Sequence, residues 1–135
     1  MVRRLLILRH AKSKWSEDGV SDHDRALARR GKRDAVRMGR ALAQHGLHPQ
    51  VILCSTARRA RATVKRLLPA VATTPQVCYC RALYAAGPLD CLRLLRHVPD
   101  EAHTVMLVGH NPGLEELVTL LGRQQFALTT THLVC

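Results

Sequence analysis

The chain has 135 residues, of which 47% are hydrophobic and 23% are charged, and 21 Lys and Arg residues against ten Asp and Glu give it a formal net charge of +11. This length predicts a single domain over residues 1–135, and the composition excludes an extended disordered chain. No apolar run approaches the roughly 20 residues that a membrane span requires, so a transmembrane protein is excluded and no membrane partner is expected. The positive charge indicates anionic partners such as nucleic acid, acidic proteins or phosphorylated substrates.

The chain has five cysteines, an odd number, and they include no Cys-x-x-Cys pair. This spacing favours neither a disulfide framework nor a zinc site. Reduced thiols are typical of a cytoplasmic protein, so we expect a cytoplasmic location.

Short apolar runs alternate with segments of helical periodicity along the whole chain. In chain order we expect a strand at 5–8, a loop at 12–24, a helix at 27–45, a strand at 51–54, a helix at 57–68, a strand at 77–80, a helix at 89–97, a strand at 104–108, a helix at 114–121 and a last strand within 128–134. The runs at 5–8, 51–54 and 105–108 are apolar throughout, as strands buried on both faces are. This order predicts an α/β fold, a three-layer α/β/α sandwich with a mainly parallel central sheet.

Arg and His residues follow three of the expected strands directly. Arg9 and His10 follow the first strand, Arg58 follows the second at a helix start, and His110 and Asn111 follow the strand at 104–108. The carboxyl ends of parallel strands meet at one edge of the sheet, where ligands bind in such folds. Arg is the preferred donor to phosphate, and helix N-termini add a favourable dipole. The pattern therefore predicts a site for a phosphate-like anion, phosphate or sulfate, among these residues.

The segment Arg9-His10-Ala11 resembles the signature of the histidine phosphatase superfamily, which has the phosphoglycerate-mutase-like fold. Within it, the chain most resembles the small phosphohistidine phosphatases of the SixA type. Four motifs in the same order along nearly the whole chain carry this resemblance: 6–13 followed by Trp15, 24–31, 54–63 and 108–112. The match departs from the pattern at Ala26 and Ala28, where relatives have Pro and Thr. The resemblance also implies a further strand or so beyond Cys135.

The resemblance implies that His10 is the nucleophile and forms a phosphohistidine intermediate, while Arg9, Arg58 and His110 hold the phosphoryl oxygens. We also expect Ser16, Arg25 and Asn111 to contact the substrate. Such phosphoryl transfer depends mainly on positioning and charge stabilisation, so neither a metal nor a cofactor is expected. The Arg charges disfavour an imidazolium at position 10 and so keep that side chain nucleophilic at neutral pH.

Many members of the superfamily place an acidic residue after the third strand to protonate an alcohol leaving group, but residues 81–88 contain no carboxylate. Without an acid an alkoxide leaves poorly, whereas a protonated imidazole leaves readily. The predicted substrate is therefore phosphohistidine on a protein, or another small phosphorylated compound. Asp18, Asp22 or Asp24 could still supply the acid.

Two other functions remain open from the sequence. One is a broad small-molecule phosphomonoesterase of the same superfamily. The other is a basic nucleic-acid-binding module, because the helix at 27–45 carries a row of Arg residues, although only 3% of the residues are aromatic and could stack on bases. Nucleic acid is the less favoured partner, and the sequence predicts no oligomeric state.

Overall fold

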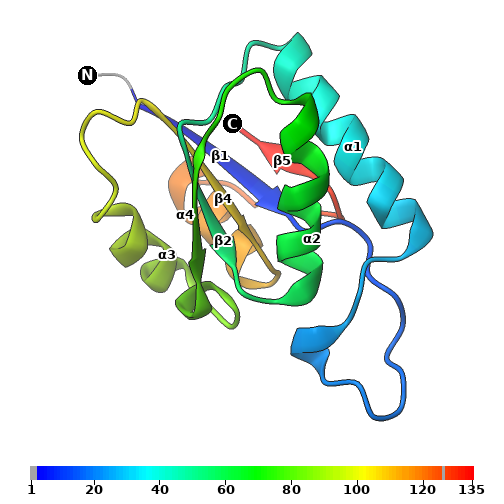
Figure 1. Ribbon diagram of the computed structural model, residues 1–135. Helices are drawn as coiled ribbons and strands as arrows, with labels where there is room; N and C mark the ends of the chain where they lie inside the picture. Colours follow the sequence, from blue (N-terminus) through cyan, green and yellow to red (C-terminus); the bar gives the residue numbers. More distant parts are fainter. Residues whose placement is uncertain (1–2, 126) are drawn as a thin grey trace.

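The computed structural model describes residues 3–125 and 127–135 and contains one five-stranded sheet. The strands are β1 (Arg4–Arg9), β2 (Val51–Ser55), β3 (Gln76–Cys80), β4 (Thr104–Gly109) and β5 (Leu133–Val134). Their order across the sheet is β3-β2-β4-β1-β5. The first four strands along the chain pair in parallel, and β5 joins β1 antiparallel at the edge (Figure 1). The predicted mainly parallel sheet is confirmed.

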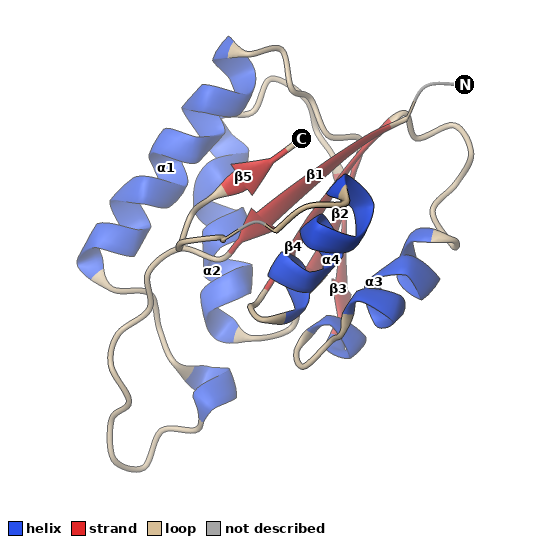
Figure 2. Cartoon of the chain, turned by 180° about the vertical axis from the view of Figure 1, so that it is seen from behind, coloured by secondary structure: helices blue, strands red, loops and turns tan. Residues whose placement is uncertain are grey.

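Four helices cover the two faces of this sheet. They are α1 (Arg29–Gln44), α2 (Arg58–Leu67), α3 (Pro88–Leu95) and α4 (Gly113–Gly122), with single-turn helices η1 (Asp22–Asp24), η2 (Leu68–Ala70) and η3 (Arg81–Leu83) between them. Figure 2 shows α3 and α4 in front of the sheet and α1 and α2 behind it. The three-layer arrangement predicted from the alternation of strands and helices is therefore confirmed.

Alternate residues of the central strands supply two separate cores. Leu6 and Leu8 of β1 face α1 and α2, together with Ile52 and Met106. Ile7, between them in the chain, packs on the opposite side with the core against α3 and α4. Successive side chains of a strand point to opposite faces, so a strand covered on both sides needs apolar residues at every position.

The first loop and α1 depart by a few residues from the expected helix at 27–45. Ala28 is the N-cap, has extended backbone angles and makes no side-chain capping bond. Its N–H donates to the carbonyl of Lys12, and the N–H of Lys14 donates to the carbonyl of Ala26. These bonds hold residues 26–28 against the segment after β1, so the helix begins at Arg29.

The expected strand within 128–134 is shortened to two residues. Leu128 is buried beside α4, where its N–H donates to Glu115 Oε1 and its carbonyl accepts from Asn111 Nδ2. A turn at 130–131, where Thr131 has a positive φ of 57°, separates Leu128 from the end of β1. The ladder with β1 therefore consists only of Leu133 and Val134. Within the described residues, no helix has the length and apolar character that crossing a bilayer requires.

Candidate active site

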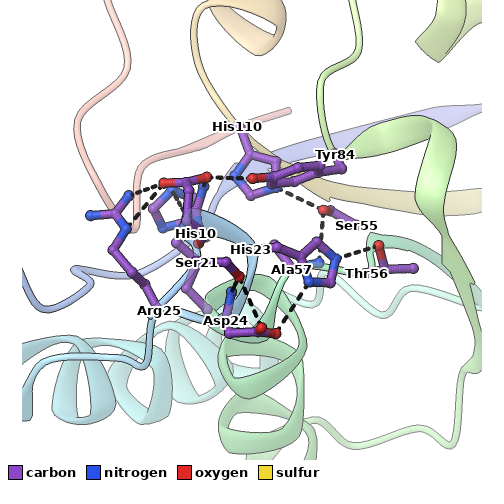
Figure 3. A network of polar contacts seen from close by, with 12 residues as sticks. His10, Ser21, His23, Asp24, Arg25, Ser55, Thr56, Ala57, Tyr84 and His110 are labelled. Carbon is purple, nitrogen blue, oxygen red and sulfur yellow. Dashed lines mark hydrogen bonds and ion pairs between the residues drawn. The ribbon is translucent and has the colours of Figure 1, made fainter. Parts of the chain in front are cut away.

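Three neighbouring strands end at one pocket. His10 follows β1, Ser55 ends β2 and His110 follows β4, and these strands are adjacent in the order β2-β4-β1. The rings of His10 and His110 lie with their centroids 5.1 Å apart. Figure 3 shows both imidazoles and the Tyr84 ring turned toward one another. The pocket has a volume of about 640 Å³, and its position agrees with the rule that ligands bind beyond the carboxyl ends of parallel strands.

The hydrogen bonds of His10 define which of its nitrogens carries a proton. Nδ1 lies 2.7 Å from the carbonyl oxygen of Ala11, and this oxygen can only accept, so Nδ1 carries the hydrogen. Nε2 lies 3.3 Å from Nε of Arg59, which can only donate, so Nε2 carries a lone pair. The ring is 6% exposed and therefore has little freedom to turn. His10 thus presents a basic Nε2 beside a guanidinium.

The environment of His10 also keeps the ring neutral. Burial lowers the pKa of His10 to about 4, the bond to the Ala11 carbonyl opposes this shift, and the charges of Arg59 and Arg9 reinforce it. At neutral pH the imidazole is therefore neutral, and its Nε2 keeps the lone pair that a nucleophile needs.

Arg59, and not Arg58, is the arginine of α2 that reaches the pocket. Arg59 is 5% exposed and lines the pocket beside His10, whereas Arg58 is exposed and lies outside it. The prediction for Arg58 is therefore wrong in its placement. Consecutive helical residues differ by about 100° around the axis, so only one of the two can face inward. The signal was present in the sequence, because Arg59 shares the helical face of Thr63 and Leu67, which are buried.

Thr63 joins this arginine to the strand that carries His10. Its hydroxyl donates to the carbonyl of Arg59 at 2.7 Å and accepts from the N–H of Ala11 at 3.0 Å. The first turn of α2 is thereby held at a fixed distance from the segment after β1. Thr63 is a positioning residue that the sequence reasoning missed.

His110 is held by Ser55, a second residue missed from the sequence. Nε2 of His110 lies 2.7 Å from Oγ of Ser55, which also accepts from the N–H of Ala57. Burial, reinforced by the neighbouring His10 and Arg59 and opposed by the charge of Asp22, lowers the pKa of His110 to about 3. His110 is therefore neutral at pH 7, and its ring is positioned by the bond with Ser55.

The remaining predicted contact residues separate into two groups. Arg9, Arg25 and Asn111 line the pocket, whereas the structure places Ser16 on the exposed first loop outside it. Arg9 donates to the carbonyl of Leu128 at 2.9 Å, and Asn111 donates to the same carbonyl at 2.8 Å. Within the described residues, Arg9 Nε and His110 Nδ1 are buried without a hydrogen-bond partner. Buried polar atoms of this kind are costly unless a ligand satisfies them.

Asp22 and Tyr84 are hydrogen-bonded to each other in the wall of the pocket, and the Tyr84 ring meets that of His110 edge-on. The Tyr84 hydroxyl donates to Asp22 Oδ2 at 2.6 Å, and Arg59 donates to the same oxygen at 3.1 Å. Arg25 pairs with the other carboxylate oxygen at 2.9 Å. The bond from Tyr84 lowers the pKa of Asp22 to about 2, burial opposes the shift, and the charges of Arg59 and Arg25 reinforce it. Of the three aspartates considered from the sequence, only Asp22 lines the pocket, and it is ionised at neutral pH.

The pocket offers donors for an anion rather than ligands for a metal. In the described parts of the chain, no group of three or more His, Cys, Asp or Glu side chains is arranged to hold a metal ion. The pocket instead combines the guanidinium groups of three arginines, the neutral imidazoles of His10 and His110, and the lone pair on Nε2 of His10.

Residues 5–79 match the family pattern described as histidine phosphatase superfamily (branch 1). This chain belongs to the histidine phosphatase superfamily. The match begins in β1, which carries Arg9, and continues through α2, which carries Arg59.

Two relatives of this superfamily member have similar sequences over most of its length. A chloroplastic protein of Arabidopsis thaliana is 32% identical over 139 residues, which cover 96% of this chain and 64% of that protein. A protein of Mycobacterium tuberculosis is 38% identical over 114 residues, covering 84% of this chain and 69% of its own length. The chain thus spans about two thirds of the length of these relatives.

Two solved structures place the chain in the SixA-like branch. A protein of Agrobacterium tumefaciens, assigned as the phosphohistidine phosphatase SixA, is 33% identical with a TM-score of 0.82, and the match covers 90% of this chain and 78% of that one. A protein of Nakamurella multipartitia with the same assignment is 35% identical with a TM-score of 0.77, covering 90% and 70% of the two chains. The resemblance read from the four motifs is confirmed at the level of the branch.

Proposed function

We propose that this chain is a phosphatase that hydrolyses phosphohistidine on a protein through a covalent intermediate on His10. The observation that carries the proposal is the state of His10, which has a neutral ring, Nδ1–H bound to the Ala11 carbonyl and a lone pair on Nε2 beside Arg59. A nucleophilic nitrogen next to guanidinium donors is suited to attack on a phosphoryl group.

In the first step of this reaction, Nε2 of His10 attacks phosphorus and the P–N bond of the substrate breaks. The substrate imidazole leaves with the bonding pair and as a neutral ring, because its other nitrogen already carries a proton. The phosphorylated His10 ring is cationic, and its Nδ1–H remains bonded to the Ala11 carbonyl. In the second step water attacks phosphorus, the P–Nε2 bond breaks, and inorganic phosphate and neutral His10 result.

Arg59, Arg9 and His110 would stabilise the equatorial phosphoryl oxygens during both steps. Arg59 reaches Nε2 of His10 directly, and Arg9 and His110 line the same pocket. A fixed guanidinium needs no reorganisation as charge develops, and a single such donor typically contributes about 10²–10³ in rate. Asp22 now pairs with Arg59, so we expect an entering phosphoryl group to compete with this carboxylate for the guanidinium.

The preference for an N-linked phosphate follows from the protonation of Asp22. With a pKa of about 2, this carboxylate holds no proton to give to an alkoxide at neutral pH. A missing general acid typically costs about 10²–10⁴ in rate for a leaving group that needs protonation. A phosphoimidazole does not need this proton and avoids the loss.

A second candidate, a broad phosphomonoesterase, is favoured by one observation. Glu116 of α4 lines the pocket at its exposed rim, and the sequence reasoning did not consider it. If Glu116 donated a proton to alcohol leaving groups, the Glu116→Gln variant would lose activity on alkyl phosphates alone.

The experiment that separates these candidates compares three substrates. We expect kcat/KM for a phosphohistidine peptide to exceed that for 3-phosphoglycerate by at least about 100-fold, with p-nitrophenyl phosphate between them because its phenolate leaves without help. Comparable rates on the peptide and on phosphoglycerate would contradict the proposal. Glu116→Gln and Asp22→Asn would then show which carboxyl group acts as the acid.

A further inference from the structure

The basic residues of the chain are concentrated on one side of the sheet. Helices α1 and α2 together carry eleven of the 21 Lys and Arg residues but only one of the ten acidic residues, Asp34. One of the eleven, Arg59, is buried in the pocket. The others give the α1–α2 layer (Figure 1) most of the positive charge of the molecule.

A groove between these two helices collects several of these charges. It has a volume of about 790 Å³, larger than the pocket at His10, and no acidic residue lines it. The cations that line it are Lys32, Arg40, Arg58, Lys65 and Arg66. Arg30 and Arg37 of α1, by contrast, are paired with Asp34 and lie outside the groove. In the described structure, Lys32, Arg40, Lys65 and Arg66 form no ion pair and so are free to meet an anionic ligand.

The floor of the groove is apolar, which limits what can fill it. Val36 of α1 and Ala62 of α2 line it, together with Pro69 and Ala70 after α2. A nucleic acid strand would supply phosphates for the rim but no aliphatic side chains for this floor, and no aromatic side chain lines the groove to stack on bases. An amphipathic acidic polypeptide supplies both, with apolar residues on the floor and carboxylates at the rim.

The groove and the active site lie on either side of a small hollow at the first loop, which Glu17 and Asp24 also line. Ala26 and Arg58 line both the groove and this hollow, and Arg25 lines both the hollow and the pocket at His10. Trp15 stands at the same hollow with 84% of its surface exposed, as an aromatic anchor for a protein partner would. A polypeptide whose phosphorylated residue occupies the pocket can therefore continue past Arg25 into the groove.

We propose that the α1–α2 groove docks an acidic, amphipathic segment flanking the phosphorylated residue of the substrate protein. This inference rests on the proposed phosphohistidine substrate and extends it to the partner's sequence. Helix α2 has ten residues and is about 15 Å long, so a flank of about twelve residues spans the groove whether helical or extended. The groove acts on binding and leaves the chemistry at His10 unchanged.

The test uses two variants with the same change in net charge. Arg40→Glu with Lys65→Glu reverses two charges inside the groove, and Arg29→Glu with Arg33→Glu reverses two exposed charges of α1 outside it. The probes are two peptides that differ only in a twelve-residue flank, one rich in Glu and Leu and one with Gln in place of Glu. Each peptide is used unphosphorylated for calorimetric binding and phosphorylated on a histidine for hydrolysis.

We expect the wild type to bind the Glu-containing peptide at least about tenfold more tightly than the Gln-containing one, and the groove variant to lose this difference. The control variant should keep it within about threefold, because long-range attraction alone contributes little beyond the Debye length. Hydrolysis of p-nitrophenyl phosphate should be the same in all three proteins. For the phosphorylated Glu-containing peptide, the groove variant should raise KM and leave kcat unchanged.

Three results would overturn this docking surface: no preference of the wild type for the Glu-containing peptide, equal losses in the groove and control variants, or tighter binding of a single-stranded RNA that the groove variant abolishes. Failure of the proposed function has a different signature. In that case the unphosphorylated Glu-containing peptide would still bind in the groove, while neither phosphohistidine peptide would be hydrolysed.

Discussion

Arg58 and Arg59 are neighbours in the sequence with opposite surroundings. Arg59 is buried against His10 and Asp22, and Arg58 is exposed at the end of the α1–α2 groove. The motif at 54–63 identified the segment, but motif position alone could not distinguish between two consecutive arginines. Helical periodicity could have made the distinction, because Thr63, four residues after Arg59, is buried on the same face.

This pair of residues provides a matched test of the site. We expect Arg59→Ala to lower kcat/KM for p-nitrophenyl phosphate by about 10²–10³, because a fixed donor to the phosphoryl oxygens is lost. Arg58→Ala should change it by less than about threefold. Circular dichroism and thermal unfolding of both variants check that Arg59→Ala still folds, and Arg59→Lys, which retains a charge but not the planar fork, should recover only part of the rate. Equal effects of the two alanine variants would contradict the placement.

The pH dependence of the reaction reports the protonation of His10. Its pKa is lowered to about 4, so the nucleophile stays neutral at pH 7 and at pH 5.5 and becomes protonated only as the pH falls through about 4. The acidic limb of kcat/KM, which reflects the free enzyme, should therefore lie near pH 4 and not at the ordinary histidine pKa of about 6.5. A profile measured from pH 3.5 to 8 with p-nitrophenyl phosphate, corrected for ionisation of the substrate, tests this. A limb at about pH 6.5 would mean that His10 is not held neutral.

Two residues of the pocket wall could not be located from the sequence because their role depends on tertiary contacts. Asp22 and Tyr84 are 62 positions apart and meet only after the first loop folds over the end of β2. The aspartate was considered together with Asp18 and Asp24, and nothing in the local sequence distinguishes the three. Asp24 bonds to Ser21 on the exposed side of the loop, whereas Asp22 turns toward Arg59.

At the scale of the elements, the central strands were predictable and the last strand was not. Residues 5–8, 51–54 and 105–108 are continuous apolar runs, and each lies within an observed strand. Residues 128–134 have three threonines and a histidine between Leu128 and Leu133, and the side chains of Asn111 and Glu115 bond to the backbone of Leu128. Tertiary contacts of this kind cannot be read from periodicity.

The close contact between α4 and the Tyr84 loop lies in the wall of the pocket. A Cβ at Gly113 would overlap the carbonyl oxygen of Ala86, so only glycine allows this approach. We expect Gly113→Ala to lower the free energy of unfolding by about 1–3 kcal/mol through overpacking, and to lower activity because the loop carrying Tyr84 must move. Chemical denaturation and the rate on p-nitrophenyl phosphate measure the two effects.

Gly87 is the matched control for this substitution. It lies in the same pocket wall, but a Cβ there would meet only Asp90 Oδ2, at an ordinary 3.8 Å. Gly87→Ala should therefore change stability and activity much less than Gly113→Ala. The same losses in both variants would show that the approach of α4 does not control the pocket.

For the molecule as a whole, the net charge of +11 follows directly from the sequence, but the distribution of this charge over the surface does not. The sequence places a row of arginines on α1, and this pattern on its own indicates a solvent-exposed helix face. Packing of α1 beside α2 turns part of it into the wall of a groove, where the charges of both helices meet. The helices can approach closely because Gly39 has no Cβ, which would overlap the carbonyl oxygen of Leu67. No local sequence pattern reveals this contact.

The central claim is that His10 is the nucleophile and reacts through Nε2. Rapid quenching of the enzyme with a phosphohistidine peptide, followed by alkaline digestion and phosphorus NMR, identifies the phosphorylated nitrogen. We expect a phosphoryl group on Nε2 of His10. A His10→Ala variant that unfolds cooperatively like the wild type should carry no phosphoryl group and should show no turnover. Phosphate on His110, on Nδ1 of His10, or turnover retained by folded His10→Ala would contradict this claim.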